Sequence, residues 1–171
     1  MSANFELTCR RDTRHLARAL ATRVAPGDLV LLDGALGAGK TFFTRAVLRA
    51  LGVPEAERVT SPTFTLVHRY DLPSRQRLVL HADLYRLRDA SELDALDLRE
   101  GREDGATLLV EWGRPFEAAL GGDALTLAIA VRADGRRSVA ASASGARSTA
   151  LLADLLADLG ARGVGVRRDS C

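Results

Sequence analysis

The sequence predicts a three-layer α/β domain whose central sheet mixes parallel and antiparallel strands. Apolar runs of strand length alternate with segments in which apolar residues recur at helical spacing. Turn signals at Asp71–Ser74 and at Asp134-Gly135 indicate hairpins, and therefore antiparallel pairs, within the sheet. With 171 residues, 47% of them hydrophobic, the chain can bury one core, and neither a repeat nor a linker divides it.

The first part of the chain predicts two strands, each followed by a helix. Phe5–Thr8 has the length of a short edge strand, and Asp12 or Thr13 can cap the helix that follows it. Leu29–Leu32 is a continuous apolar run, as expected of a strand covered on both faces. Helical spacing of apolar residues then continues over Thr41–Leu51.

The middle of the chain predicts a hairpin followed by a buried strand. Thr63–Tyr70 is rich in β-branched and aromatic residues, and Leu78–Asp83 is a second run of strand length. The turn at Asp71–Ser74 would join these two strands into a hairpin. Thr107–Glu111 is another buried strand, and it ends in an acid.

The remaining elements are two helices and a second hairpin. Ser91 with Asp94 resembles a capping box that opens a short helix. Ala124–Arg132 and Arg137–Ser142 flank the turn signal and form the hairpin. A final helix carries leucines along one face, at Leu151, Leu152, Leu155, Leu156 and Leu159.

Composition bounds the function and the compartment. We expect a single domain over residues 1–159 and a flexible, glycine- and arginine-rich tail over 160–171. The net charge of +2 argues against a broad nucleic-acid footprint. Two cysteines, Cys9 and Cys171, make no disulfide framework. Because no apolar run reaches the roughly 18–20 residues of a membrane span and no signal peptide is evident, we expect a cytoplasmic protein without a membrane partner.

Gly34–Thr41 carries the clearest functional motif. It fits G-x-x-x-x-G-K-[ST] in full, with a predicted strand before it and a helix after it, and therefore predicts a P-loop NTPase-like fold. Lys40 is the only lysine among 24 cationic residues, and it stands where an ammonium would reach the β- and γ-phosphates. Thr41 would offer a hydroxyl to Mg²⁺. Backbone N–H groups would surround the phosphates at Gly37, Ala38, Gly39, Lys40, Thr41 and Phe42.

Two acids end predicted strands and can complete a hydrolytic site. Glu111 resembles the acid that follows an apolar strand and holds magnesium through water, and Asp83 ends the strand before it. If these strands run parallel to Leu29–Leu32, both acids lie at the carboxyl edge of the sheet beside the loop. The neighbouring His81 is expected to pack or to bond locally rather than to catalyse.

Together these motifs resemble the TsaE family, the ATPase component of bacterial tRNA threonylcarbamoyladenosine formation. The resemblance extends from about Asp12 to the hairpin at Gly135-Arg136. Its motifs are Gly34–Thr41, Ser61–Val67, His81–Leu87 and Val110–Trp112. The resemblance implies an ATP- and Mg²⁺-dependent enzyme with weak ATPase activity that partner proteins stimulate. The partners would be the TsaB–TsaD pair, which modifies adenosine 37 of tRNA, so that contact with tRNA is indirect.

The resemblance also implies roles for individual residues. Lys40, Asp83 and Glu111 would be catalytic, and Thr41 with Glu111 would hold the metal. Ser61 and Thr63 match a switch-like segment, and Trp112 matches an aromatic near the nucleotide. The chain departs from the family at Ala35, where an acid is usual, and at Phe42, where a second threonine is frequent. Arg10–Thr13 and Arg136 are candidate walls for the nucleotide.

Two other functions remain open from the residues alone. A P-loop small-molecule kinase would use lid arginines, for which Arg99, Arg102 and Arg114 are candidates, although no long lid insertion is evident. A nucleotide-dependent interaction module that does not hydrolyse ATP would keep its function without Glu111 and Asp83.

Overall fold

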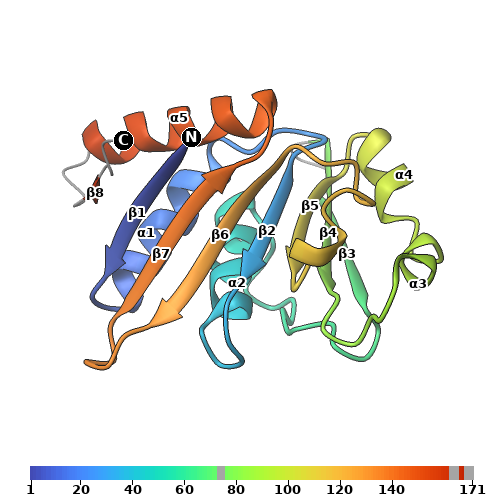
Figure 1. Ribbon diagram of the computed structural model, residues 1–171, viewed down its shortest axis with the longest axis horizontal. Helices are drawn as coiled ribbons and strands as arrows, with labels where there is room; N and C mark the ends of the chain where they lie inside the picture. The colour runs from blue at the N-terminus through green and yellow to red at the C-terminus, as the bar shows by residue number, and fades with distance from the viewer. Residues whose placement is uncertain (73–75, 162–165, 168–171) are drawn as a thin grey trace.

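Among the residues that the structure describes, one eight-stranded mixed sheet forms the centre of the molecule (Figure 1). The computed structural model describes residues 1–72, 76–161 and 166–167. The strand order is β3-β4-β5-β2-β6-β7-β1-β8. The strands are β1 (Ser2–Leu7), β2 (Leu29–Asp33), β3 (Val67–Leu72), β4 (Arg77–Asp83), β5 (Thr107–Glu111), β6 (Ala124–Val131), β7 (Arg137–Ala143) and β8 (Val166–Arg167).

The predicted mixture of strand directions is confirmed. β2 runs parallel to β5 and to β6, and β4 runs parallel to β5. β3 pairs antiparallel with β4, and β7 pairs antiparallel with β6 and β1, so both predicted hairpins form. The parallel strands at the centre are the ones that read as continuous apolar runs, because both of their faces are covered.

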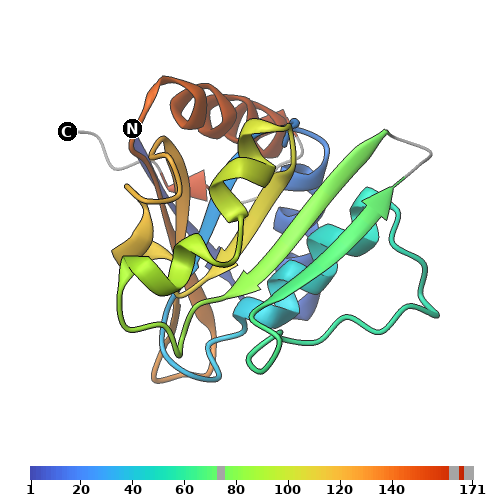
Figure 2. The same cartoon turned by 90° about the vertical axis from the view of Figure 1, so that its right-hand side faces the viewer.

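Helices cover both faces of the sheet (Figure 2). The helices are α1 (Arg10–Ala21), α2 (Lys40–Leu51), α3 (Ala90–Asp94), α4 (Leu98–Glu103), α5 (Ala146–Ala161) and the 3-10 helix η2 (Arg114–Phe116). β2 shows the two-sided burial directly. Val30 and Leu32 join the core under α1, α2 and α5, whereas Leu29 and Leu31 join the core under α3, α4 and η2. The three layers therefore meet at the strand that leads into the phosphate loop.

The prediction of a strand from Thr63 was wrong at its N-terminal end. Thr63–Thr65 forms a turn, and β3 begins only at Val67. Leu66 has a positive φ of 64°, and its N–H donates to Pro62 O at 2.6 Å. This turn, together with side-chain bonds from Ser61 and Thr63, overrides the β propensity of the segment.

The predicted helix caps were also displaced. α1 begins at Arg10 after Cys9, and Asp12 instead occupies its third position. The Asp12 carboxylate accepts from Thr8 N at 2.8 Å and Cys9 N at 3.2 Å, so it caps from inside the first turn. α3 is capped by Asp89, whose carboxylate accepts from the amides of Ser91 and Glu92. The cap of α3 is therefore Asp89, two residues before the predicted Ser91.

The N-terminal strand pairs with the last described residues of the chain. β1, predicted as an edge strand, lies between β7 and β8, and Val166 pairs with Phe5. Of the segment predicted to be a flexible tail, Gly160 and Ala161 belong to α5 and Val166–Arg167 forms β8, whereas 162–165 and 168–171 lie outside the described residues. Of the turn predicted over Asp71–Ser74, Asp71 and Leu72 instead belong to β3, and 73 and 74 lie outside the described residues. Within the described ranges, no helix is both long and apolar enough to cross a membrane.

Candidate nucleotide site

The phosphate loop joins the carboxyl end of β2 to the first turn of α2. Gly34 has φ +135°, and a Cβ there would lie 2.2 Å from Ile129 O on β6, so only glycine fits. Gly39 has φ +112° and is the N-cap of α2, where it brings no side chain that could cap the helix amides. The first-turn N–H groups of α2 are therefore available to an anion, and the helix dipole favours one there.

Lys40 is buried within this loop, with a relative exposure of 5%. Its ammonium donates to Gly34 O at 2.6 Å and to Ala35 O at 3.0 Å. Burial lowers the pKa of Lys40, and the nearby charges of Glu111, Asp83 and Asp33 oppose that change. Three carboxylates therefore lie near the Lys40 ammonium, an arrangement that favours a phosphate accompanied by a divalent ion.

Thr41 and Glu111 meet at the predicted metal position. Thr41 Oγ1 donates to Glu111 Oε2 at 3.0 Å, and Glu111 Oε1 lies 2.9 Å from His81 Nε2. Asp83 and Glu111 are register partners on the parallel strands β4 and β5, which brings both acids to one edge as predicted. A hydroxyl and a carboxylate are hard oxygen donors, so these residues fit Mg²⁺, which takes few protein ligands and keeps several waters.

A second hydrogen-bonded group surrounds Asp83. Its Oδ2 accepts from the hydroxyl of Ser61 and from Thr63 Oγ1, the latter at 2.9 Å, and its Oδ1 accepts from Tyr85 N at 3.1 Å. The side chain is almost fully buried. The loop between α2 and β3 is thereby tied to the acidic edge of the sheet.

Trp112 links these two groups of residues. It has an unusual positive φ of 61°, and its N–H donates to Leu32 O at 3.1 Å. Its ring centroid lies 3.9 Å from Lys40 Nζ and 5.0 Å from the ring of Tyr85. The aromatic after Glu111 is thus placed directly over the buried ammonium, in cation–π contact.

A cavity of about 240 Å³ adjoins the loop on the α1 side. Arg10 and Thr13, predicted as walls, line it, and so does Phe42. Arg137 also lines it and donates to Ala38 O at 2.8 Å. Sequence reasoning missed Arg137, because the register of the hairpin decides which of two neighbouring arginines faces the loop.

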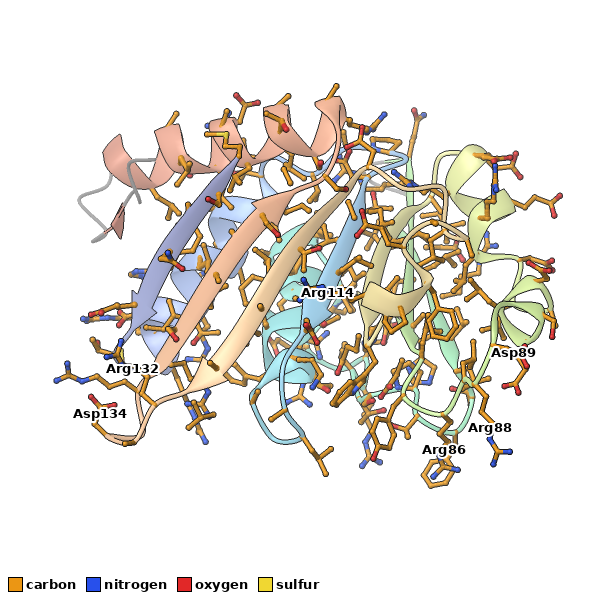
Figure 3. All side chains as sticks on the ribbon, in the orientation of Figure 1. Arg86, Arg88, Asp89, Arg114, Arg132 and Asp134 are labelled. Atoms are coloured by element: carbon orange, nitrogen blue, oxygen red, sulfur yellow. The ribbon has the colours of Figure 1, made fainter. Side chains whose placement is uncertain are left out.

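The predicted Arg136 has a different environment. Its Nε lies 3.7 Å from Asp134 Oδ2, an ion pair in which both side chains are more than half exposed. Asp134 marks the tip of the β6–β7 hairpin, away from the sheet (Figure 3). Arg136 precedes the first residue of β7 and does not line the cavity beside the loop.

Asp33 was missed as a site residue. It ends β2, and its Oδ1 accepts from Gly34 N at 2.8 Å. Its Oδ2 lies 3.5 Å from Arg114 Nη1, and Arg114 reaches from η2 across β2 (Figure 3). The signal in the sequence was an acid between an apolar strand and the loop.

The other two candidate lid arginines lie elsewhere. Arg99 pairs with Glu103 at 3.0 Å on the exposed side of α4. Arg102 donates to Gly27 O at 2.9 Å and to Leu120 O at 2.8 Å. Gly27 precedes the N-terminal end of β2, whereas the phosphate loop follows its C-terminal end. Arg102 therefore lies at the end of β2 that is opposite to the loop.

The sequence matches the family model described as threonylcarbamoyl adenosine biosynthesis protein TsaE over residues 7–139. Similar proteins include a tRNA threonylcarbamoyladenosine biosynthesis protein TsaE of Bacillus subtilis (strain 168), 35% identical over 147 residues, which are 84% of this chain and 87% of that protein. The protein of the same name from Mycobacterium tuberculosis is 43% identical over 110 residues, 60% of this chain and 63% of that one.

A solved structure shares the fold. The crystal structure of YdiB from Bacillus subtilis superimposes with a TM-score of 0.77 at 27% sequence identity, covering 92% of this chain and 96% of that chain. The α/β architecture predicted from the sequence is therefore confirmed by a protein of known structure.

Proposed function

Since this chain belongs to the TsaE family, we propose that it is the ATP-binding and ATP-hydrolysing component of tRNA N6-threonylcarbamoyladenosine formation. One observation carries the proposal: the loop lysine, the loop threonine and Glu111 converge at one edge of the sheet, with Asp83 beside them. We propose weak, Mg²⁺-dependent ATPase activity that yields ADP and phosphate.

Each residue has a role that follows from its contacts. Lys40 binds the β- and γ-phosphates, and the amides at Gly37, Ala38, Gly39 and Thr41 surround them. Thr41 and Glu111 hold Mg²⁺, which neutralises phosphate charge when it is bound. Asp83 orients the attacking water or the Ser61–Thr63 segment that it already anchors.

The remaining nucleotide contacts are proposed from the cavity and from the family resemblance. Phe42 contributes its backbone N–H and an aromatic wall, and Arg137 supplies a cation next to the loop. Thr63 bonds to Asp83, and the ring of Trp112 lies over Lys40. Both residues are therefore proposed to lie near the bound phosphates. Arg136 is proposed to reach the nucleotide only with a change in the hairpin, since in this structure it pairs with Asp134.

We propose that residues 1–159 act as one ATPase domain in the cytoplasm and dock on the TsaB–TsaD pair. Contact with tRNA is then indirect, through that complex. A net charge of only +2 agrees with a protein that does not itself bind tRNA over a large surface.

The test is ATP hydrolysis measured with and without the TsaB–TsaD pair. We expect slow turnover alone and a stable complex, or stimulated turnover, with the pair. If saturating TsaB–TsaD neither bound the protein nor changed its ATPase rate, the proposal would be abandoned. Phosphate transfer to a metabolite, unaffected by the pair, would favour the kinase alternative instead.

Two variants separate hydrolysis from nucleotide-dependent docking. Glu111→Gln and Asp83→Asn remove a charge from each acid with little change in shape. We expect both variants to lose turnover. If both retained complex formation and supported tRNA modification as well as the unaltered protein, the non-hydrolysing interaction module would be the better description.

A further inference from the structure

The carboxylate of Glu111 is held at both of its oxygens. Oε2 accepts from Thr41 Oγ1 at 3.0 Å, and Oε1 lies 2.9 Å from Nε2 of His81. Glu111 and His81 have relative exposures of 2% and 0%. A buried carboxylate with a fixed donor on each oxygen has one orientation, and the second donor comes from a residue with no part in the phosphate loop.

The backbone register explains how His81 reaches Glu111. Side chains alternate between the faces of a strand, so His81 and Asp83 lie on the same face of β4 as Val79, which belongs to the core under α2. The adjacent parallel strand β5 places Glu111 on that same face, because Leu109, two residues earlier, also belongs to the core under α2. The imidazole and the carboxylate therefore project from the same face of neighbouring strands, within hydrogen-bonding distance of each other.

The second nitrogen of the ring shows that the imidazole is costly at this position. Nδ1 of His81 is buried and has no hydrogen-bond partner within the described part of the chain. His68, its register partner on β3, approaches only edge-on, with ring centroids 6.4 Å apart. A side chain that merely filled this space would be better apolar, because an unpaired buried nitrogen is destabilising. The contact that offsets this cost is the one from Nε2 to Glu111.

We propose that His81 is a positioning residue for the metal site: its Nε2–H holds Oε1 of Glu111 and thereby aims Oε2 at the position beside Thr41. The inference rests on the proposed function, because Mg²⁺ with a nucleotide is the ligand that Glu111 would serve. His81 touches neither nucleotide nor metal. It acts on the affinity for Mg²⁺ through the orientation of Glu111, as partners of metal-binding side chains generally do.

The experiment measures Mg²⁺ dependence of nucleotide binding rather than turnover. Trp112, the only tryptophan, lies over Lys40 and next to Glu111, so its fluorescence reports the site. Mg²⁺ is titrated at a fixed concentration of a non-hydrolysable ATP analogue. The variants are His81→Leu, which lacks a donor, and His81→Gln, whose amide nitrogen can replace Nε2. His68→Leu is the matched control, since it removes the neighbouring imidazole on β3 and leaves Glu111 untouched.

We expect His81→Leu to raise the half-saturating Mg²⁺ concentration by roughly tenfold or more, the usual effect of losing such a partner. Affinity for the analogue without Mg²⁺ stays unchanged, because Lys40 and the loop amides are intact. His81→Gln stays within about threefold of the unaltered protein, and so does His68→Leu. A purely structural role for His81 would not separate metal-dependent from metal-free binding.

Each other outcome has a defined meaning. If His81→Leu folds and requires no more Mg²⁺ than the unaltered protein, the positioning role is wrong. If His81→Leu does not fold, His81→Asn replaces it, because its shorter amide cannot reach Glu111 as Nε2 does. Equal Mg²⁺ requirements of the Asn and Gln variants then overturn the inference. If the unaltered protein binds the analogue without any Mg²⁺ dependence, the proposed function fails, whatever the variants do.

Discussion

The ammonium of Lys40 has three hydrogens, and two of them are directed at the carbonyl oxygens of Gly34 and Ala35. The loop thus fixes the amine by its own backbone and leaves one N–H that the β- and γ-phosphates can share. The planar guanidinium of arginine holds its donors in a rigid fork, whereas the compact ammonium of lysine can direct its three donors to separate acceptors. A chain that otherwise uses arginine for every cation retains lysine where a compact charge must fit among backbone carbonyls.

We therefore expect Lys40→Ala to weaken ATP binding by about tenfold to a hundredfold, because a hydrogen bond to a charged group contributes about 1.5–3 kcal/mol. Lys40→Arg should lose much of the same affinity although it keeps the charge. Calorimetric titration with ATP and Mg²⁺ measures both, with thermal melts as the control for folding. Unchanged affinity in the alanine variant would contradict the role assigned to Lys40.

Asp83 differs from Lys40 in what its loss should change. Asp83→Asn keeps an oxygen for Tyr85 N but removes the negative charge that accepts from Ser61 and Thr63. We expect hydrolysis to fall roughly a hundredfold while ATP affinity stays within about threefold. Asp71→Asn, on the exposed pair with Arg69, is the control and should change neither value. A large loss of binding in Asp83→Asn would make Asp83 a binding residue instead.

At the scale of elements, the sequence predicted what local periodicity determines. The prediction was right for the buried strands β2 and β5 and for the loop between β2 and α2. A continuous apolar run and a complete motif are each compatible with few other local structures. The start of β3 did not match, because Ser61 and Thr63 bond to Asp83, which lies 20 or more positions along the chain. Arg137 was missed for the same reason: a contact between hairpin and loop has no local signal.

The start of α1 gives a prediction of its own. Asp12 accepts hydrogen bonds from the hydroxyl and amide of Thr8 and from the amide of Cys9, and chiefly the Thr8 hydroxyl lowers the pKa of this carboxyl below 3.8. A carboxyl whose pKa is lower in the folded than in the unfolded state stabilises the fold at pH values above its pKa in the unfolded state. That contribution is lost as pH falls through the pKa of the folded state.

Asp12→Asn should therefore reduce the free energy of unfolding at pH 7 by about 0.5–1 kcal/mol, the range of a partly exposed cap. The difference from the unaltered protein should shrink as pH falls below 3.8. Urea unfolding at several pH values measures it, with Asp154→Asn on the exposed side of α5 as the control. A difference that persisted unchanged at low pH would mean that the charge of Asp12 is not what matters.

Across the whole molecule, the two ends of the central strands have different roles. The carboxyl ends of β2, β4 and β5 carry the acids and the phosphate loop, where ligands bind in open α/β sheets. At the N-terminal ends of β2 and β6, Arg102 of α4 donates to the carbonyls of Gly27, Leu120 and Gly122 at 2.7–2.9 Å. One side chain thus joins α4 to the turn before β2 and to the turn before β6.

Arg102→Met should separate stability from catalysis. It removes the donors to several partly buried carbonyls, so we expect the free energy of unfolding to fall by about 3 kcal/mol, measured by urea denaturation. ATP affinity and turnover should be unchanged at temperatures where the variant stays folded, since Arg102 lies at the edge away from Lys40. Arg99→Met on the same helix removes only the exposed pair with Glu103 and should cost less than about 0.5 kcal/mol. If Arg102→Met instead kept its stability and lost a phosphoryl-transfer activity, Arg102 would be a lid arginine and the kinase alternative would regain its support.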